Sequence, residues 1–175
     1  IYVLYEPLMR FASASIEHMF YHASMTLFAE LHAHTCWSMR EGASSSDEMV
    51  DRALSLGYAA MAITDHDNLY GAMEYARAAR ERGLKPITGC ELTVGGEGSA
   101  RSHLTVLAET VEGYRNLCRL LSQAYRTYGK DEPRIEERWL FERNEGLIVL
   151  SGCGAGAIPR LLRTEERRQA AMLAG

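Results

Sequence analysis

The stretch FAELHAHTCWSMREG, residues 28–42, carries two histidines one residue apart at the end of a short apolar run. Residues i and i+2 of a strand point to the same face, so His32 and His34 can bind one metal ion together, or one ion each of a close pair. The loop that follows supplies a carboxylate, Glu41. Because a lone His-x-His pair is more often half-exposed surface than a ligand pair, the rest of the chain decides between these two interpretations.

Strand-like and helix-like segments alternate along the chain, with short connections between them. We expect strands at residues 27–34, 58–64, 85–94, 103–109 and 146–152, and helices at 44–57, 69–83, 110–129, 135–145 and 155–174. Ser46 is the expected N-cap of the first helix, Gly57 its C-terminal stop, and Pro159 a break in the last helix. This alternation predicts an α/β fold with a mainly parallel sheet.

Potential metal ligands recur where these strands end. In α/β folds, functional groups collect at the carboxyl ends of the strands. The second strand ends in Asp65, His66 and Asp67, the third carries Glu91 near its end, and the last runs into Cys153. His103 precedes its apolar run instead of following it, so it reaches the same end only from an antiparallel strand or by a bent approach.

These residue types suit metal-dependent hydrolysis. Imidazole binds zinc, iron and manganese, and carboxylates add oxygen ligands that can bridge two ions. With the first two histidines, a cluster of two or three ions would take the following set: Glu41, His66, Glu91, His103 and Cys153. Such a cluster lowers the pKa of bound water and clamps phosphate oxygens, so the natural reaction is phosphoester hydrolysis.

Each of these residues also has a simpler interpretation. Asp65 and His66 can serve as turn residues, because aspartate favours loops. Glu91 can be a solvated side chain, and a cysteine such as Cys153 in a small-residue loop is more often an inert buried thiol. Only their recurrence at one end of successive strands favours the metal site.

Length, charge and cysteine content narrow the class of protein. A chain of 175 residues suits one domain with a hydrophobic core. A net charge of −4 argues against a generic basic nucleic-acid binder, but it allows a small site that holds phosphate through metal ions. No apolar run reaches the roughly 18–20 residues that span a bilayer, so no membrane partner is expected. The four cysteines form no CxxC pair, which favours a reducing cytoplasm.

Taken together, the motifs resemble those of the PHP (polymerase and histidinol phosphatase) domain. The matching pieces are ELHAHTCWSMREGAS (30–44), AITDHDNLYGAMEYARAA (62–79), GLKPITGCELTV (83–94), HLTVLAETVEGYRNLCRLLSQA (103–124) and GLIVLSGCGAG (146–156). They cover the chain from Met25 to about Leu162 in the family's order and spacing. The sequence looks most like the version in bacterial C-family DNA polymerases, and the fourth and fifth pieces look similar to the error-prone translesion branch.

The resemblance implies a fold and a ligand set. The fold is a distorted seven-stranded β/α barrel with up to three divalent ions, such as zinc, manganese or iron, at the carboxyl ends of its strands. The implied metal ligands are His32, His34, Glu41, His66, Glu91, His103 and Cys153. Asp65 would orient a ligand imidazole without binding metal itself. The family often has aspartate where this chain has Glu41, whose longer side chain shifts the geometry of that ligand.

The resemblance also sets expectations for the limits of the domain. We expect the PHP domain to occupy residues 25–175, preceded by an extension of uncertain status at residues 1–24. The chain stops before the late Asp-x-His pair that closes the family's site, and it lacks the catalytic palm of the polymerases. We therefore interpret it as a fragment whose parent polymerase supplies DNA synthesis, contact with DNA, and further domains in cis.

Four functions remain open at this point. The first is an error-prone polymerase PHP domain with phosphodiesterase activity, such as 3′–5′ trimming of DNA. The second is a metal-stabilised scaffold of the same polymerase that hydrolyses nothing. The third is a free-standing phosphatase for a small phosphomonoester such as histidinol phosphate, whose gene would end only about a hundred residues further on. The fourth is an α/β interaction domain without metal.

Overall fold

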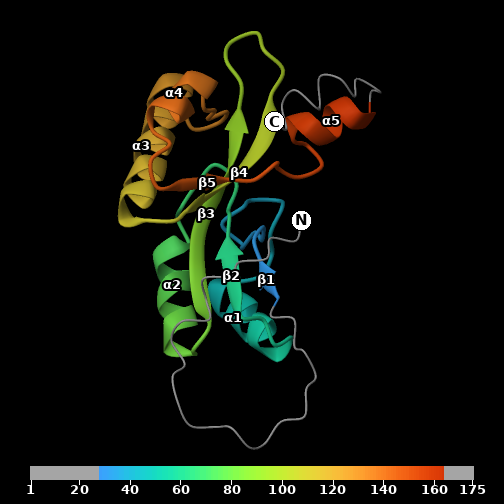
Figure 1. Cartoon of the computed structure of the whole chain (residues 1–175), viewed down its shortest axis with the longest axis vertical. Helices are drawn as coiled ribbons and strands as arrows, with labels where there is room; N and C mark the ends of the chain where they lie inside the picture. The colour runs from blue at the N-terminus through green and yellow to red at the C-terminus, as the bar shows by residue number, and fades with distance from the viewer. Residues whose placement is uncertain (1–27, 164–175) are drawn as a thin grey trace, which may run out of the picture.

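The computed structural model describes residues 28–163, and the expected extension at residues 1–24 lies outside that range. Five strands form one sheet in the order β1-β2-β3-β4-β5, which confirms the α/β class (Figure 1). The strands are β1 (Ala29–Glu30), β2 (Ala60–Ile63), β3 (Lys85–Val94), β4 (Ser102–Ala108) and β5 (Leu147–Val149). The helices are α1 (Ser46–Ser55), α2 (Ala72–Glu81), α3 (Val111–Tyr128), α4 (Glu137–Glu142) and α5 (Ala157–Arg163).

The sheet is parallel in one part and antiparallel in the other. β1, β2 and β3 run parallel, whereas β4 is antiparallel to both β3 and β5. The expectation of a mainly parallel sheet is therefore wrong for β4. Residues 95–101 between β3 and β4 are too few for the helical crossover that a parallel pair needs, so the chain turns back as a hairpin. The reversal places His103 opposite Thr93, which is the antiparallel approach that its position in the sequence required.

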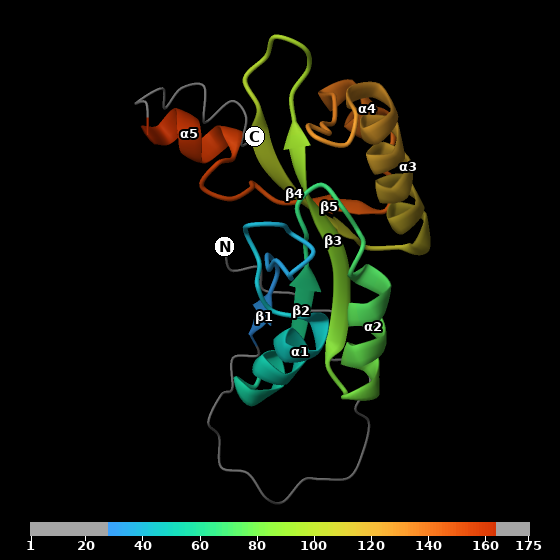
Figure 2. The ribbon, with the colours of Figure 1, turned by 180° about the vertical axis from the view of Figure 1, so that it is seen from behind.

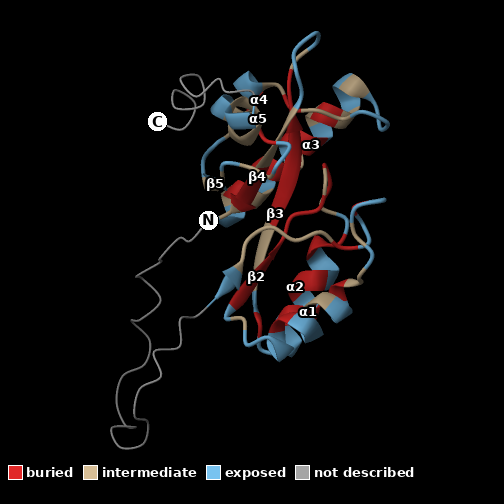
Figure 3. Ribbon diagram, turned by 90° about the vertical axis from the view of Figure 1, so that its right-hand side faces the viewer, coloured by how far each residue is buried: buried red, intermediate tan, exposed pale blue. Residues whose placement is uncertain are grey.

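β3 has two different faces. Cys90, Leu92 and Val94 enter a hydrophobic core that is shared with β4, α3 and α4. Side chains alternate along a strand, so the intervening Glu91 and Thr93 belong to the opposite face, where they are buried as well. Figure 3 shows the buried stretch of β3 in the middle of the molecule. One strand thus supplies both the core and a polar buried surface.

The helices cover the sheet in two groups. α1 and α2 pack with β2 around a second apolar core that includes Val50, Met61 and Tyr75. In the view from behind, α2 and α3 lie one after the other along β3 (Figure 2). Among residues 28–163, no helix has the length and apolar character needed to span a bilayer.

Local hydrogen bonds shift the starts of two helices from their expected places. The N-cap of α1 is Ser45, not Ser46. The Ser45 hydroxyl accepts a hydrogen bond from the backbone N–H of Glu48, and the Glu48 carboxylate accepts one from the backbone N–H of Ser45. α4 begins only at Glu137, because Ile135 pairs with β3 through hydrogen bonds to Thr93 and Gly95.

The expected break at Pro159 is absent. α5 begins at Ala157, so the proline lies in the first turn, where its missing N–H costs no helical hydrogen bond. The rest of the predicted helix, beyond Arg163, lies outside the described residues.

β1 is shorter than the predicted strand at residues 27–34. The carboxylate of Glu30 accepts hydrogen bonds from the backbone N–H groups of Leu31 and His32, each at 3.0 Å, which diverts these donors from the sheet. His32 and His34 therefore lie on the irregular segment that follows β1. Their spacing still brings them together, with 3.2 Å between the two Nε2 atoms.

Gly113, in the first turn of α3, packs directly against the backbone that leads into β5. A Cβ atom at this position would overlap the carbonyl oxygen of Gly146. We expect Gly113→Ala to lower the free energy of unfolding by about 1–3 kcal/mol through overpacking, although alanine favours a helix over glycine by about 1 kcal/mol. Urea denaturation measures the change against Ser122→Ala, an exposed position of the same helix. A midpoint equal to or above that of the wild type would contradict the close packing.

Candidate metal centre

Glu91 is the buried centre of the candidate site. Only 2% of its side chain is exposed, and four imidazoles approach its carboxylate from β4 and from the segments that follow β1 and β2. The distances from carboxylate oxygen to ring nitrogen are 2.9 Å for His32, 3.9 Å for His34, 3.1 Å for His66 and 2.8 Å for His103. Glu91 is therefore no solvated side chain.

The imidazoles form two groups that share this carboxylate. His32 and His34 make the first group with Glu91, and His66 and His103 make the second. Within each group, the potential ligand atoms all lie within 4.8 Å of one another. A carboxylate common to two such groups suits a pair of neighbouring ions.

Glu41 and Cys153 lie at the edges of these groups. Glu41 Oε2 is 3.3 Å from Nδ1 of His34 and 3.5 Å from Nδ1 of His66, and 43% of its side chain is exposed. Cys153, in the loop after β5, places its sulfur 3.6 Å from Nδ1 of His103. The structure thus brings all the predicted ligands together, while their binding of metal stays a prediction.

Asp65 organises the loop that carries Glu41. Its carboxylate accepts hydrogen bonds from the backbone N–H of Thr35 at 2.7 Å and from its hydroxyl at 2.8 Å. It also accepts from the hydroxyl of Ser38 at 2.6 Å, and the Ser38 oxygen accepts in turn from the backbone N–H of His66. These bonds fix the two ligand loops against each other.

The expected orienting role of Asp65 can act on His66 only through intermediate groups. The hydrogen bonds of its carboxylate within residues 28–163 go to Thr35 and Ser38, not to an imidazole ring. Asp65 is only 2% exposed and lies beneath the loop, so it acts on His66 through Ser38 and the backbone.

Of the two aspartates that flank His66, Asp67 is the one whose carboxylate contacts the imidazole ring, although the sequence interpretation left it out of the ligand set and gave it no orienting role. Its Oδ2 lies 3.2 Å from Nε2 of His66, and it accepts two further hydrogen bonds from the backbone N–H and the hydroxyl of Thr93. Thr93 was also missed, although it follows Glu91 by two residues and so shares its face of β3. That period of two was the available signal.

Burial and neighbouring charges set the protonation of the cluster. Burial lowers the pKa of His34, which favours its neutral, metal-binding form. Burial alone would raise the pKa of Glu91, but its interactions with His32 and His66 outweigh this effect and hold the pKa well below its ordinary value. Burial also raises the pKa of the Cys153 thiol, so the thiol stays protonated at neutral pH unless a cation displaces the proton.

The residues present fit divalent metal ions. Glu91 Oε2 is buried and makes no hydrogen bond of good geometry within the described residues, although Nε2 of His32 lies 2.9 Å away. The Nε2 atoms of His32 and His34 also face each other at 3.2 Å, so one of the two must offer a lone pair. A cation satisfies both the carboxylate oxygen and these lone pairs.

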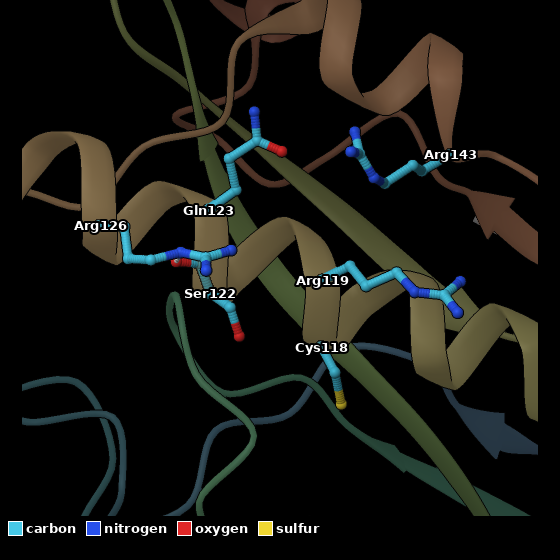
Figure 4. A pocket seen from close by; sticks show the side chains of 6 residues that line it. All are labelled: Cys118, Arg119, Ser122, Gln123, Arg126 and Arg143. Atoms are coloured by element: carbon cyan, nitrogen blue, oxygen red, sulfur yellow. Dashed lines mark hydrogen bonds between the residues drawn. The ribbon is translucent and has the colours of Figure 1, made fainter.

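A separate surface depression of about 380 Å³ lies over α3 and the end of α4 (Figure 4). Its lining residues are Cys118, Arg119, Ser122, Gln123, Arg126 and Arg143. None of these is a predicted ligand, so the candidate metal centre and this depression are different places on the molecule.

A family model described as the PHP domain matches residues 30–174. The chain belongs to the PHP family. The residues that carried the resemblance in the sequence, from the histidine pair to the loop around Cys153, all fall inside this match.

Curated relatives of this PHP chain are bacterial DNA polymerases. DNA polymerase III subunit alpha of Treponema pallidum is 41% identical over 153 residues, which cover 82% of this chain and 13% of the relative. The error-prone DNA polymerase of Mycobacterium tuberculosis strain H37Rv is 40% identical over 147 residues, covering 79% of this chain and 13% of the relative. The chain thus spans about an eighth of the length of these relatives, and the two identities do not separate the replicative from the error-prone branch.

Solved structures resemble the PHP chain over part of its length. A candidate metal-dependent phosphoesterase from Bifidobacterium adolescentis superposes with a TM-score of 0.47 at 24% sequence identity. The superposition covers 58% of this chain and 34% of the other.

The metal-free PHP chain should lose stability as the pH rises through the pKa of His66. The hydrogen bond to Asp67, followed by that to Glu91, raises this pKa from 6.5 to about 10. His66 therefore binds a proton more tightly in the folded state than in the unfolded state. The stabilisation of the fold by this proton is complete below pH 6.5 and is lost as the pH rises towards about 10. Urea denaturation at a series of pH values, with chelator present, should show this decline in the wild type and not in His66→Gln. Parallel pH profiles for the two proteins would contradict it.

Proposed function

We propose that this chain is the PHP region of a bacterial C-family DNA polymerase and that its metal centre hydrolyses phosphodiester bonds at the 3′ end of DNA. The observation that carries the proposal is Glu91, a buried carboxylate shared by two groups of imidazoles. The identity of about 40% to polymerase PHP regions supports DNA as the substrate.

The buried and the exposed side chains of the cluster would have different roles. Divalent ions held here would stabilise the negative charge of a phosphate and lower the pKa of water. Glu91 and the buried loop contacts of Asp65 hold the ligands in place before substrate arrives. Glu41 is the exposed carboxylate of the set, within reach of both His34 and His66, so it is the ligand free to adjust when a phosphate enters.

The finer features of the proposal rest on the sequence. We assign the chain to the error-prone, translesion branch because of the motifs at residues 103–124 and 146–156, and we place the start of the domain at Met25. The complete domain would hold up to three ions of zinc, manganese or iron, with Cys153 as a ligand beside His103. The parent polymerase would contribute DNA synthesis in the cytoplasm and the remaining domains.

The decisive experiment is a nuclease assay on the protein in its longest native form. A 3′-labelled single-stranded DNA is incubated with manganese or zinc, without nucleotides, so that synthesis cannot mask cleavage. We expect metal-dependent release of the label by the wild type and loss of release to the metal-free level in the His32→Ala, His34→Ala double mutant, because that mutant lacks two of the three ligands of the first group.

Two controls make this assay specific. Ser122→Ala, on the exposed face of α3, should cleave like the wild type. Histidinol phosphate as a parallel substrate separates the alternatives, since a free-standing phosphatase would prefer it to DNA. Cleavage that persists in the double mutant at wild-type rate would sink the proposal.

A metal-stabilised scaffold is the second candidate, and the topology favours it. The imidazoles come from both the parallel and the antiparallel part of the sheet: His32, His34 and His66 follow β1 and β2, while His103 begins β4. A bound ion would therefore tie the two parts of the molecule together. Such a role requires no hydrolysis.

Chelation tests the stabilising contribution of the metal. An ion at 100 times its Kd would add about 2.7 kcal/mol to the stability of the folded state. We expect EDTA to lower the melting temperature of the wild type and to change that of the His32→Ala, His34→Ala double mutant less. An unchanged melting temperature of the wild type would remove the basis of the scaffold role, whatever the nuclease assay shows.

A further inference from the structure

Asp67 adopts a backbone conformation that needs an explanation. Its φ of 51° lies in the left-handed region, which residues other than glycine seldom enter. Three contacts hold it there: its N–H donates to the carbonyl of Glu91 at 2.8 Å, its own carbonyl accepts from the hydroxyl of Tyr125 at 3.0 Å, and its carboxylate binds Thr93. The result is a fixed carboxylate, 5% exposed as a residue, directly beside His66.

This carboxylate and Thr93 present only acceptors to one edge of the His66 ring. The Thr93 hydroxyl donates its proton to Asp67 Oδ2 at 2.6 Å, so its oxygen is left as an acceptor. Nε2 of His66 lies 3.2 Å from that hydroxyl oxygen and 3.2 Å from Asp67 Oδ2. Nε2 must therefore carry a proton, which it donates to this pair.

The other ring nitrogen faces the metal ligands. Nδ1 of His66 lies 3.1 Å from Glu91 Oε1 and 3.5 Å from Glu41 Oε2, and the neighbouring His103 also presents its Nδ1 to Glu91. In contrast, His32 presents Nε2 to the same carboxylate. The two imidazole groups thus turn opposite nitrogens toward Glu91.

We propose that Asp67 is a positioning residue that holds His66 as the Nε2-protonated tautomer, so that Nδ1 is the atom that binds a metal ion. The first group, His32 and His34, meets its ion through Nε2, whereas the second meets its ion through Nδ1. This inference rests on the metal centre of the proposed function but not on its hydrolytic activity. It assigns to Asp67 the orienting role that the sequence interpretation had given to Asp65.

The ligand atom is measured directly by nitrogen NMR of the histidine side chains, with the wild-type protein loaded with Zn²⁺ alone. We expect His66 to show a protonated Nε2 and a zinc-shifted Nδ1, and His32 the reverse. Zinc on Nε2 of His66 would overturn the proposal without any variant being made. Because zinc is diamagnetic and no substrate is present, the result is independent of whether the centre cleaves DNA.

The variant Asp67→Asn tests whether the Asp67 carboxylate is what fixes the tautomer of His66. Whichever way the amide turns, its nitrogen replaces an acceptor with a donor, either against Nε2 of His66 or against the N–H of Thr93. We expect zinc affinity, measured by competition with a chelating dye, to fall about 10–100-fold, which is the usual effect of losing a carboxylate that orients a ligand. Glu97→Gln, an exposed acid in the β3–β4 hairpin, makes the same charge change and should bind zinc like the wild type.

Asp67→Gly separates the carboxylate from the backbone. Glycine adopts a φ of 51° without strain, so this variant keeps the turn and loses only the side chain. It should also bind zinc more weakly, even if Asp67→Asn fails to fold. A lower melting temperature of the zinc-free variants with unchanged zinc affinity would show a merely structural role and overturn the proposal.

Discussion

The convergence of four imidazoles on the carboxylate of Glu91 is the interaction on which the rest of the site depends. A carboxylate that is 2% exposed is costly to bury unless cations or hydrogen-bond donors surround it. In the absence of metal, protonated imidazole fills this need. The hydrogen bond to Asp67, and after it the one to Glu91, raises the pKa of His66 to about 10. In the proposed metal centre, ions and protons would compete for the same nitrogens, so the Glu91 carboxylate would be compensated in either state.

β3 makes this convergence possible. It is the only strand in residues 28–163 that pairs with both a parallel and an antiparallel neighbour. Its period of two places apolar side chains such as Leu92 in the α3 core and Glu91 and Thr93 on the other face. Glu91 lies opposite Thr105 of β4 and forms an isolated parallel β-bridge with His66, which follows β2. The predicted ligands of these three neighbouring strands therefore meet without any long loop.

The sequence predicted the residue types and element order of this arrangement, because strand ends are visible in the apolar pattern. It did not predict that β4 is antiparallel to β3. The direction of β4 depends on whether residues 95–101 are long enough to carry the chain back to the other end of the sheet, and they are too short for such a crossover. It also gave the orienting role to Asp65, whereas we propose that role for Asp67. Two aspartates on either side of His66 are equivalent in a sequence, and only the left-handed φ of Asp67 and the loop contacts of Asp65 separate them.

The two aspartates act on different parts of the same histidine. Asp65 fixes the loop at Thr35 and Ser38 and so holds the His66 backbone, while Asp67 fixes the ring. Both carboxylates are buried, and both accept hydrogen bonds from backbone N–H and hydroxyl groups of the protein. Neither therefore needs a metal ion to remain in place. The cluster is therefore preorganised without metal, and the exposed Glu41 is the member of the proposed ligand set that has room to move. A metal centre with one adjustable carboxylate over a fixed set of imidazoles, as proposed here, would exchange that ligand for a phosphate oxygen without disturbing the fold.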